Sequence, residues 1–210
     1  MRKPVHESGL SRLSLLTEPD EFEDLLRLAK KGDADSFATL WRTFQPGLLR
    51  YLRVIAGQAA DDIAADTWLQ VIRKLHTFEG NDRAFRAWIC TIARNRHIDW
   101  RRQTARRKEA LVEIDVLDRI PTVDDTETPM STQSALTLIA TLPADQAEAV
   151  MLRTVAGLSV SAVSEIMGRP PGTVRVLCHR GLRRLAHTLE GMVPDKALPE
   201  MNSQADEVVV

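Results

Sequence analysis

The sequence predicts an all-α protein of two small helical domains, an N-terminal helical bundle and a C-terminal helix-turn-helix domain, joined by an acidic linker. Apolar residues recur with a helical period over most of the chain, and no segment shows the alternation of a convincing strand. The 210 residues suit one or two domains, and 44% of them are hydrophobic, as in ordinary folded proteins. The expected parts are a poorly ordered extension at 1–20, domains at 21–108 and 131–190, the linker at 109–130 and a poorly ordered tail at 191–210.

The first two helices are bounded by residues that begin and end helices. One is expected over residues 21–31, because Gly32 suits the position after a helix. The next begins near 33–36, where Asp and Ser side chains provide N-cap chemistry. Pro46 is expected to interrupt this helix locally before it continues to Gly57. Its predicted apolar face carries Phe37, Leu40, Trp41 and Phe44.

The third and fourth helices carry opposite charges on their outer faces. The third is expected to begin at Asp61 and Asp62, since carboxylates suit a helix N-terminus. Helical spacing predicts that it buries Ala64, Trp68, Val71, Ile72 and Leu75 and exposes Asp62, Asp66, Gln70 and Arg73. After a loop, the fourth helix is expected from Phe85 to about Arg107, with arginines on its outer face and an inner face of Phe85, Ile89, Ile92 and Ala93.

The second domain is also predicted to be helical throughout. A short helix is expected over residues 136–142, and Pro143 is expected to open another that runs to Val155. Ser159 is expected to cap a brief helix that ends before a turn at 168–172. The last helix is expected from Thr173 to about Leu189.

Charge is strongly segregated along the chain, although the net charge is only −1. Residues 83–108 contain nine basic side chains and one acid, Asp99, whereas residues 109–129 contain seven acids and one arginine. Residues 169–187 contain five arginines, two histidines and no acid, and the tail from residue 190 is acidic again. Two basic regions separated by an acidic tether are compatible with nucleic-acid binding despite the near-neutral total.

The segment from Leu158 to Leu185 is interpreted as a helix-turn-helix: a short helix, a turn with glycine and a longer basic helix. At about 100° per residue, the long helix packs through one face and turns Arg175, Val176, His179, Arg180 and Arg183 to the other. Backbone N–H groups at 172–174 are expected to suit a phosphate. A helical hairpin with a solvated basic face is the simpler alternative, but such faces normally mix both signs of charge.

The sequence lacks the patterns of a catalytic or metal site. It contains no H-x-x-x-H, nucleophile elbow or P-loop, so no catalytic residue, metal or cofactor is expected. Cys90 and Cys178 lie far apart, which indicates a reducing compartment rather than a disulfide framework. No apolar run of about 18 residues and no signal-peptide pattern is present, so a cytoplasmic protein without membrane insertion is expected.

Segments of both predicted domains resemble the extracytoplasmic-function sigma factors of bacterial RNA polymerase. GTVRVLCHRGLRRL resembles the family's helix that reads the minus-thirty-five promoter element, and LPADQAEAVMLRTVAGLSVSAVSEIMG resembles the helices before it. AADDIAADTWLQVIRKL followed by FRAWICTIARNRHIDWRRQTARR resembles the family's first domain. The resemblance covers residues 22–108 and 132–189. It implies a two-domain sigma factor, not an enzyme, that directs core RNA polymerase to promoters and helps to open them.

The resemblance implies roles for individual residues. Positions that dock on the clamp helices of the polymerase are matched by Asp61, Asp62, Asp66 and Gln70. The loop at 78–83 matches the loop that captures a flipped promoter base, with Asn81 as the polar reader. The resemblance implies minus-ten residues in this loop and on the fourth helix. They are Asn81, Arg83, Arg86, Arg94, Asn95, Trp100, Arg101 and Arg102. The implied minus-thirty-five residues are Gly172, Thr173, Arg175, Val176, His179, Arg180 and Arg183.

Several of these positions have a simpler interpretation. Acids at the start of the third helix are favoured at any helix N-terminus, and Trp88 is expected to pack in the core. The acidic linker either threads into the polymerase channel, as in the family, or is a solvated tether. The family usually has Ser then Arg where this chain has Val176 and Leu177. Because Val176 lies on the DNA side, a thymine preference is predicted there.

The implied partners are core RNA polymerase, contacted at its clamp helices and flap, and promoter DNA. An anti-sigma factor is expected from the family alone, and the free protein is expected to be a monomer. The acidic tail either folds back on the basic faces or is disordered. The alternative function is that of a stand-alone helix-turn-helix regulator, which binds DNA as a dimer. The sequence shows no heptad or apolar stripe for a dimer interface, and this alternative leaves the first domain unexplained.

Overall fold

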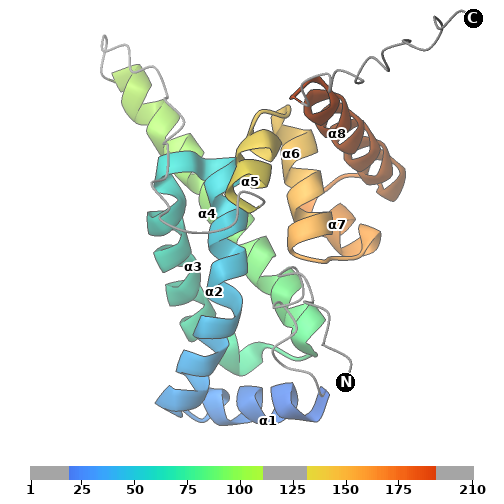
Figure 1. Cartoon of the computed structure of the whole chain (residues 1–210). Coiled ribbons are helices and arrows are strands. Elements are labelled where there is room, and N and C mark those ends of the chain that lie inside the picture. The colour runs from blue at the N-terminus through green and yellow to red at the C-terminus, as the bar shows by residue number, and fades with distance from the viewer. Residues whose placement is uncertain (1–18, 111–131, 193–210) are drawn as a thin grey trace, which may run out of the picture.

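The computed structural model describes residues 19–110 and 132–192, and all elements within them are helical (Figure 1). The all-α prediction is confirmed for these residues. Nearly all of the expected N-terminal extension, acidic linker and tail lies outside the described residues. None of the described helices combines the length and the apolar character needed to cross a membrane.

The first domain begins with two helices, α1, Pro19–Lys30, and α2, Ala34–Ala56. They are joined at the predicted turn. Gly32 has a φ of 90°, which favours glycine, and the Asp33 carboxylate accepts a hydrogen bond from the Ser36 amide at 2.8 Å. The predicted interruption at Pro46 is wrong, because α2 runs through it unbroken. Pro46 and Arg42, one turn earlier, are both exposed. The carbonyl group that loses its amide partner therefore lies on the solvent side of the helix.

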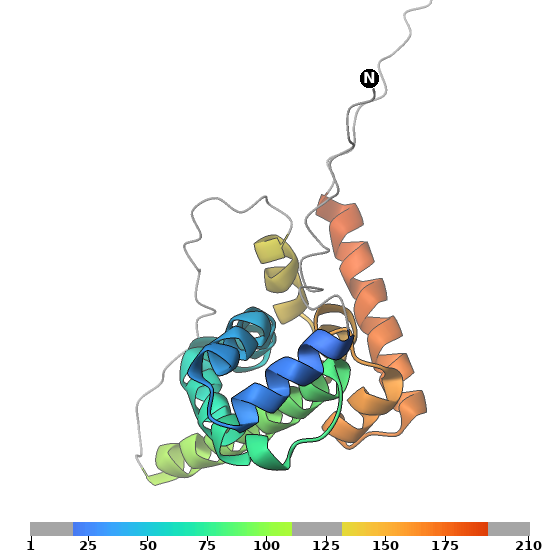
Figure 2. The ribbon, with the colours of Figure 1, turned by 90° about the horizontal axis from the view of Figure 1, so that it is seen from below.

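Two more helices complete the first domain: α3, Ala60–Lys74, and α4, Asp82–Ala110. Short 3₁₀ turns precede and follow α3, at Gly57–Ala59 and Leu75–Thr77. α4 begins three residues before the predicted Phe85. The cause is the Asn81 side chain, whose Oδ1 accepts a hydrogen bond from the Ala84 amide at 3.0 Å and so caps the helix. The last turns of α4 project beyond the rest of the domain (Figures 1 and 2).

Two residues predicted on apolar inner faces lie at the surface. The exposed fraction is 54% for Ile72 on α3 and 42% for Trp41 on α2. The buried residues of α3 are Ala60, Ile63, Ala64, Thr67, Trp68 and Val71. Ile72 follows Val71 by about 100° around the helix, which carries it past the edge of this stripe.

The core of the first domain is an aromatic cluster that joins α1, α2 and α4. Phe85 on α4 lies against Phe22, Phe44 and Phe78, with ring centroids 5.7, 4.9 and 5.1 Å away. Trp88 is half-buried and packs on Phe78 at 4.9 Å, as expected for a core residue. These edge-to-face and tilted contacts orient α4 and the loop before it.

The second domain contains α5, Thr132–Ala140, α6, Ala144–Val150, α7, Val160–Met167, and α8, Pro171–Met192. α5 begins and ends earlier than predicted. Pro143 is the residue before α6 rather than its first residue, and the predicted single helix to Val155 ends as a π-helical turn, Met151–Val155. Ser159 caps α7 as predicted, accepting a hydrogen bond from the Ala162 amide.

The two domains pack against each other, which no pattern in the sequence predicted. α5, α6 and the π-helical turn contact α2, while α7 contacts α4. Figure 1 shows this arrangement, with α5 and α6 beside α2. Buried residues of both domains form a single hydrophobic cluster. The second domain therefore covers one side of the first, including part of α4.

Candidate nucleic-acid interface

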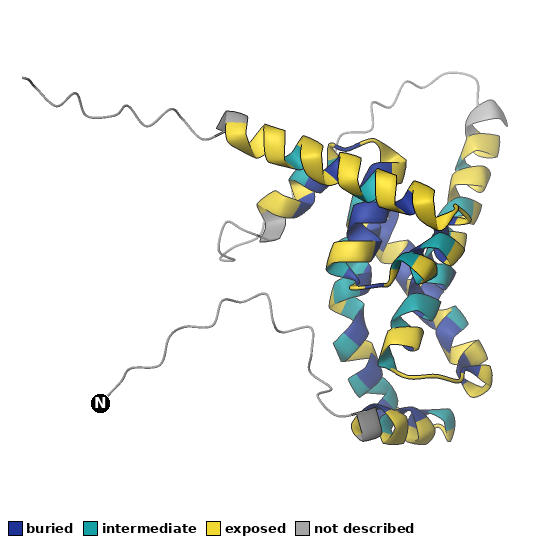
Figure 3. Ribbon diagram, turned by 90° about the vertical axis from the view of Figure 1, so that its right-hand side faces the viewer, coloured by how far each residue is buried: buried dark blue, intermediate teal, exposed yellow. Residues whose placement is uncertain are grey.

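The outer face of α8 is the most clearly built candidate surface. Val174 and Gly181 are buried, Cys178 and Leu185 are half-buried, and all seven predicted minus-thirty-five residues are exposed. Figure 3 shows how much of α8 is exposed. The predicted division of this helix into a packing face and an outer face is therefore correct. Within residues 169–187 the outer face carries arginine and histidine with no carboxylate.

The turn between α7 and α8 is held by specific contacts. Gly168 adopts the left-handed conformation after α7, and the Ser164 hydroxyl donates to the Arg169 carbonyl oxygen at 2.5 Å. The Arg169 guanidinium pairs with Asp145 on α6 at 3.0 Å. The Val174 amide donates to the Pro170 carbonyl oxygen at 3.1 Å. The expectation that this amide is available for a phosphate is therefore wrong.

The exposed face of α3 contains the predicted protein-docking residues together with apolar ones. Asp61, Asp62 and Asp66 are exposed and Gln70 is half-buried. Leu69 lies beside them with an exposed fraction of 52%, and Ile72 flanks it. Sequence reasoning did not name Leu69, and it placed Ile72 in the core. Leu69 follows Asp62 by seven positions and so lies on nearly the same side of the helix, a signal that was available in the sequence.

The predicted minus-ten residues on α4 separate into exposed and engaged groups. The side chains of Arg83, Asn95, Trp100, Arg101 and Arg102 are exposed. Arg86 is half-buried, pairs with Asp82 at 3.4 Å and lies over the Phe44 ring at 5.5 Å. Arg94 is also half-buried and pairs with Glu148 of the second domain at 2.8 Å. The structure therefore does not present the predicted set as one open surface.

Glu148 connects the two domains through a short network. Its Oε1 accepts hydrogen bonds from Arg94 Nε at 2.8 Å and from the Tyr51 hydroxyl at 2.9 Å. Burial, and then the Glu148 carboxylate, raise the pKa of Tyr51 well above its usual value, so the hydroxyl is protonated and donates. Neither Tyr51 nor Glu148 was singled out from the sequence, because nothing local marks a contact across 97 residues.

The C-terminal half of α4 carries a second arrangement of charged and aromatic groups. His97 stacks on Trp100, with ring centroids 6.3 Å apart and an interplanar angle of 17°. Burial, followed by the charges of Arg101 and Arg94, lowers the pKa of His97 to about 4, so the ring is neutral near pH 7. Asp99 lies 4.0 Å from both Arg96 and Arg102, one helical turn away on either side.

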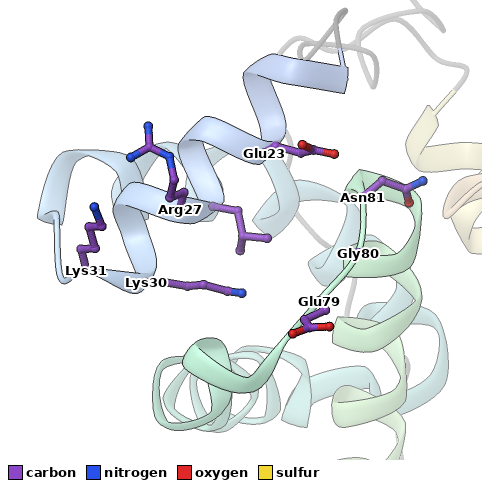
Figure 4. Close-up of a pocket in the computed structure, with 8 residues that line it drawn as sticks. Glu23, Arg27, Lys30, Lys31, Glu79, Gly80 and Asn81 are labelled. Carbon is purple, nitrogen blue, oxygen red and sulfur yellow. The ribbon is translucent and has the colours of Figure 1, made fainter.

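A cavity of about 620 Å³ lies between α1 and the loop before α4 (Figure 4). Its α1 side includes three basic residues, Arg27, Lys30 and Lys31, and its loop side is Glu79, Gly80 and Asn81. Gly80 has a φ of 136°, and a Cβ atom there would lie 2.8 Å from Ala84 Cβ. This position requires glycine to bring the loop close to α4. The basic residues of α1 were not predicted to take part in the site.

The described residues contain no group of three potential metal-ligating side chains. Burial raises the pKa of Cys90 to about 12 and also raises that of Cys178, so both side chains are protonated near pH 7. Each is a packing residue in this structure: Cys90 is buried, and the Cys178 thiol lies 3.5 Å from the Ala149 carbonyl oxygen.

Two family models match the chain. The model for Sigma-70 region 2 matches residues 40–107, and the model for Sigma-70, region 4 matches residues 132–185. These ranges correspond to α2 through α4 and to α5 through most of α8.

Characterised relatives give the same assignment. The ECF RNA polymerase sigma factor BldN of Streptomyces coelicolor is 30% identical over 202 residues, which cover 93% of this chain and 71% of BldN. The ECF RNA polymerase sigma factor SigD of Mycobacterium tuberculosis is 30% identical over 182 residues, covering 82% and 85%.

Solved structures share the fold. Sigma factor RpoE in complex with the anti-sigma factor NepR, from Bartonella quintana, is 25% identical with a TM-score of 0.59, covering 75% of this chain and 98% of that one. CnrH, solved with the cytosolic domain of CnrY, has a TM-score of 0.55 at 21% identity, covering 81% and 98%, and supports the fold alone. Sequence relatives, both family models and the order of the two domains thus agree that the chain belongs to the extracytoplasmic-function sigma factors, which direct RNA polymerase to promoters.

Proposed function

We propose that this sigma factor uses three separate surfaces: α3 docks on the clamp helices of core RNA polymerase, α4 and the preceding loop bind the minus-ten element, and α8 reads the minus-thirty-five element. The observation that carries the proposal is the outer face of α8. There Arg175, Arg180 and Arg183 are exposed on a helix that packs through its opposite face. Arginine reads guanine edges in the major groove and also contacts phosphates.

The minus-ten surface combines a capped loop with a basic helix. Asn81 uses its carbonyl oxygen to cap α4, which leaves its amide nitrogen to donate to the edge of a flipped base. Arg83, Arg101 and Arg102 are exposed along α4 and provide a path for the strand backbone, with Trp100 as a stacking platform. Lys30 and Lys31 on the α1 side of the cavity extend this path.

Docking on the polymerase is proposed for the exposed face of α3. Interfaces are generally built from an apolar centre with a polar rim. Leu69 and Ile72 provide apolar surface, and Asp61, Asp62 and Asp66 provide acids around it. Solvent-exposed leucine and isoleucine side chains on the same face as the family's docking positions support this assignment over that of ordinary helix-terminal acids.

The remaining features of the proposed function follow from the family and from the solved neighbour. We infer that catalysis belongs to the polymerase, that the protein acts in the cytoplasm without a cofactor and that it is a monomer when free. Because RpoE was solved with an anti-sigma factor, an anti-sigma factor is also proposed as a partner here. The acidic linker predicted at 109–130 lies almost entirely outside the described residues.

The test is a pull-down of purified core polymerase followed by run-off transcription on a pool of promoter fragments. We expect stoichiometric binding and new start sites. Arg180→Ala should lower transcription from those sites about tenfold while polymerase binding stays unchanged. Arg184→Ala, an exposed arginine outside the proposed set, is the matched control. Tight binding to duplex DNA without any binding to polymerase would instead support a stand-alone regulator.

A further inference from the structure

Trp100, the proposed stacking platform of the minus-ten surface, is paired with a second ring on the same helix. The His97 imidazole lies three residues earlier on α4, with its centroid 6.3 Å from that of the Trp100 indole and an interplanar angle of 17°. Nearly parallel rings at this separation form an offset stack. Side chains three positions apart on a helix are neighbours, so α4 alone brings the two rings together.

The stack restricts a side chain that is otherwise open to solvent. Trp100 has an exposed fraction of 38%, and His97 is the one ring that contacts it in the described part of the chain. A side chain that becomes fixed on binding a ligand loses rotamer entropy. By packing on the indole, His97 removes part of this cost before a strand arrives. The part of the indole that stays exposed is available to a base.

The imidazole suits this position because it is partly enclosed and uncharged. His97 is half-buried, and its Nδ1 atom is buried without a hydrogen-bond partner among the residues described. A charged ring would place an N–H group there with no acceptor. Burial, followed by the charges of Arg101 and Arg94, lowers the pKa of His97 to about 4. The ring is therefore neutral near pH 7 and packs on the indole as an apolar surface.

The residues next to the pair indicate what the exposed part of the indole binds. Arg101 and Arg102 follow Trp100 directly and are exposed. Sites for single strands combine aromatic rings that stack on bases with basic side chains that follow the backbone. The other tryptophan of α4, Trp88, is half-buried against Phe78. Trp100 is therefore the tryptophan of this helix that can stack on a base.

We propose that His97 is a positioning residue of the minus-ten surface, whose ring holds the Trp100 indole in the orientation in which it stacks on a base of the opened strand. This role rests on the proposed function, because Trp100 is the platform assigned there. His97 acts through the indole and does not itself contact the base. Replacing His97 should therefore matter only while Trp100 is present.

The experiment uses variants of the full chain. His97→Ala removes the ring, whereas His97→Phe keeps a ring that can stack. Trp100→Ala removes the platform, and the double variant of His97→Ala and Trp100→Ala tests whether the two residues act together. Gln103→Ala is the matched control, because Gln103 is exposed and lies as far after Trp100 on α4 as His97 lies before it. Circular dichroism in urea establishes that each variant is folded.

The first readout is promoter opening with core polymerase, measured by permanganate footprinting. An aromatic pair contributes enough for about a fivefold change, so His97→Ala should open promoters about fivefold less than the wild type. His97→Phe should restore most of the opening, and Gln103→Ala should match the wild type. In the Trp100→Ala background, His97→Ala should cause no further loss.

The second readout reports on the indole without polymerase or DNA. The four tryptophans are replaced by fluorotryptophan, and the fluorine NMR resonance of residue 100 is assigned by its absence in Trp100→Phe. His97→Ala should move this resonance toward its position in the urea-unfolded chain, because the stacked ring is lost. In His97→Phe it should stay away from that position. A change in overall stability alone would not move the resonance of the folded chain.

The positioning role is contradicted if His97→Ala leaves either the opening or the Trp100 resonance unchanged. It is also contradicted if His97→Ala lowers the opening equally with and without Trp100, or if His97→Phe opens promoters no better than His97→Ala. Normal opening by Trp100→Ala has a different meaning, since it removes the platform from the proposed function and the role of His97 with it. A defect in Trp100→Ala without one in His97→Ala counts against His97 alone.

Discussion

Gly181 on α8 faces Val150 on α6 so closely that a Cβ atom at Gly181 would lie 2.8 Å from Val150 Cγ2. Val150 is buried, and Leu142 Cδ1 lies 3.4 Å from the same point. A stiff, enclosed valine has little room to move aside. The absence of a side chain at Gly181 is therefore what allows α8, which carries the proposed minus-thirty-five face, to approach α6 this closely.

Gly181→Ala is expected to destabilise the protein by about 1–3 kcal/mol, because overpacking outweighs the better helix propensity of alanine. The measurement is the urea dependence of circular dichroism. Gly172→Ala is the control, since no atom lies within 4 Å of a Cβ at that position. An unchanged unfolding midpoint for Gly181→Ala would show that α6 and α8 move apart without a loss of stability.

Asn81 combines a structural and a proposed functional role, and two substitutions separate them. Asn81→Ala should lower stability by about 1 kcal/mol, because the cap of α4 is lost. Asn81→Asp should keep the cap and the stability, since aspartate caps equally well, but should reduce promoter opening because the donating amide is absent. Permanganate footprinting with core polymerase measures the opening. Normal opening by Asn81→Asp would remove Asn81 from the base-reading role.

Leu69 is expected to contribute to polymerase binding rather than to folding. Its exposed fraction is 52%, so Leu69→Ala should leave the unfolding midpoint nearly unchanged and weaken polymerase binding about tenfold. Leu28→Ala on α1, with a leucine that is 40% exposed, is the control. Competition with a labelled sigma factor for core polymerase measures the affinity. Equal affinities for the two variants would contradict the docking assignment of α3.

Val176 is expected to influence promoter choice. It is 46% exposed on the outer face of α8, where an apolar side chain can contact a thymine methyl group. Val176→Ser should therefore reduce the preference for thymine at one minus-thirty-five position in a promoter-library assay. The base preferences at the other positions serve as the reference. An unchanged profile would mean that Val176 does not read a base.

His97 is expected to make stability depend on pH in the mildly acidic range. The pKa of His97 is lowered from 6.5 to about 4 in the folded protein, so between these values the unfolded chain binds the extra proton. The contribution of the neutral ring is complete above pH 6.5 and is lost as the pH falls toward 4. Urea midpoints at pH 7 and pH 5 should differ more for the wild type than for His97→Gln. Equal differences would show that the pKa of His97 is the same in the folded and the unfolded chain.

Local sequence patterns predicted much of the secondary structure and one of the surfaces of this protein. The order of the helices, the Asp33 and Ser159 caps and the outer face of α8 were all predicted correctly, because periodicity and capping depend on residues within one or two turns. The family was also predicted from two motifs in the correct order. Pro46 and Ile72 were predicted wrongly, since whether a helix face is covered depends on neighbours that a local pattern does not contain.

The contacts between distant segments required the folded structure. Arg94 and Glu148 are 54 residues apart and belong to different domains, and neither residue type indicates its partner. The sequence showed Arg94 only as one arginine among several on a basic helix. The fold placed it against a carboxylate and a tyrosine, because packing α2 against α5 and α6 brought α4 under the second domain. The sequence thus determined the charge and polarity of each surface. Which of its residues are exposed to solvent was decided by the tertiary packing of the helices.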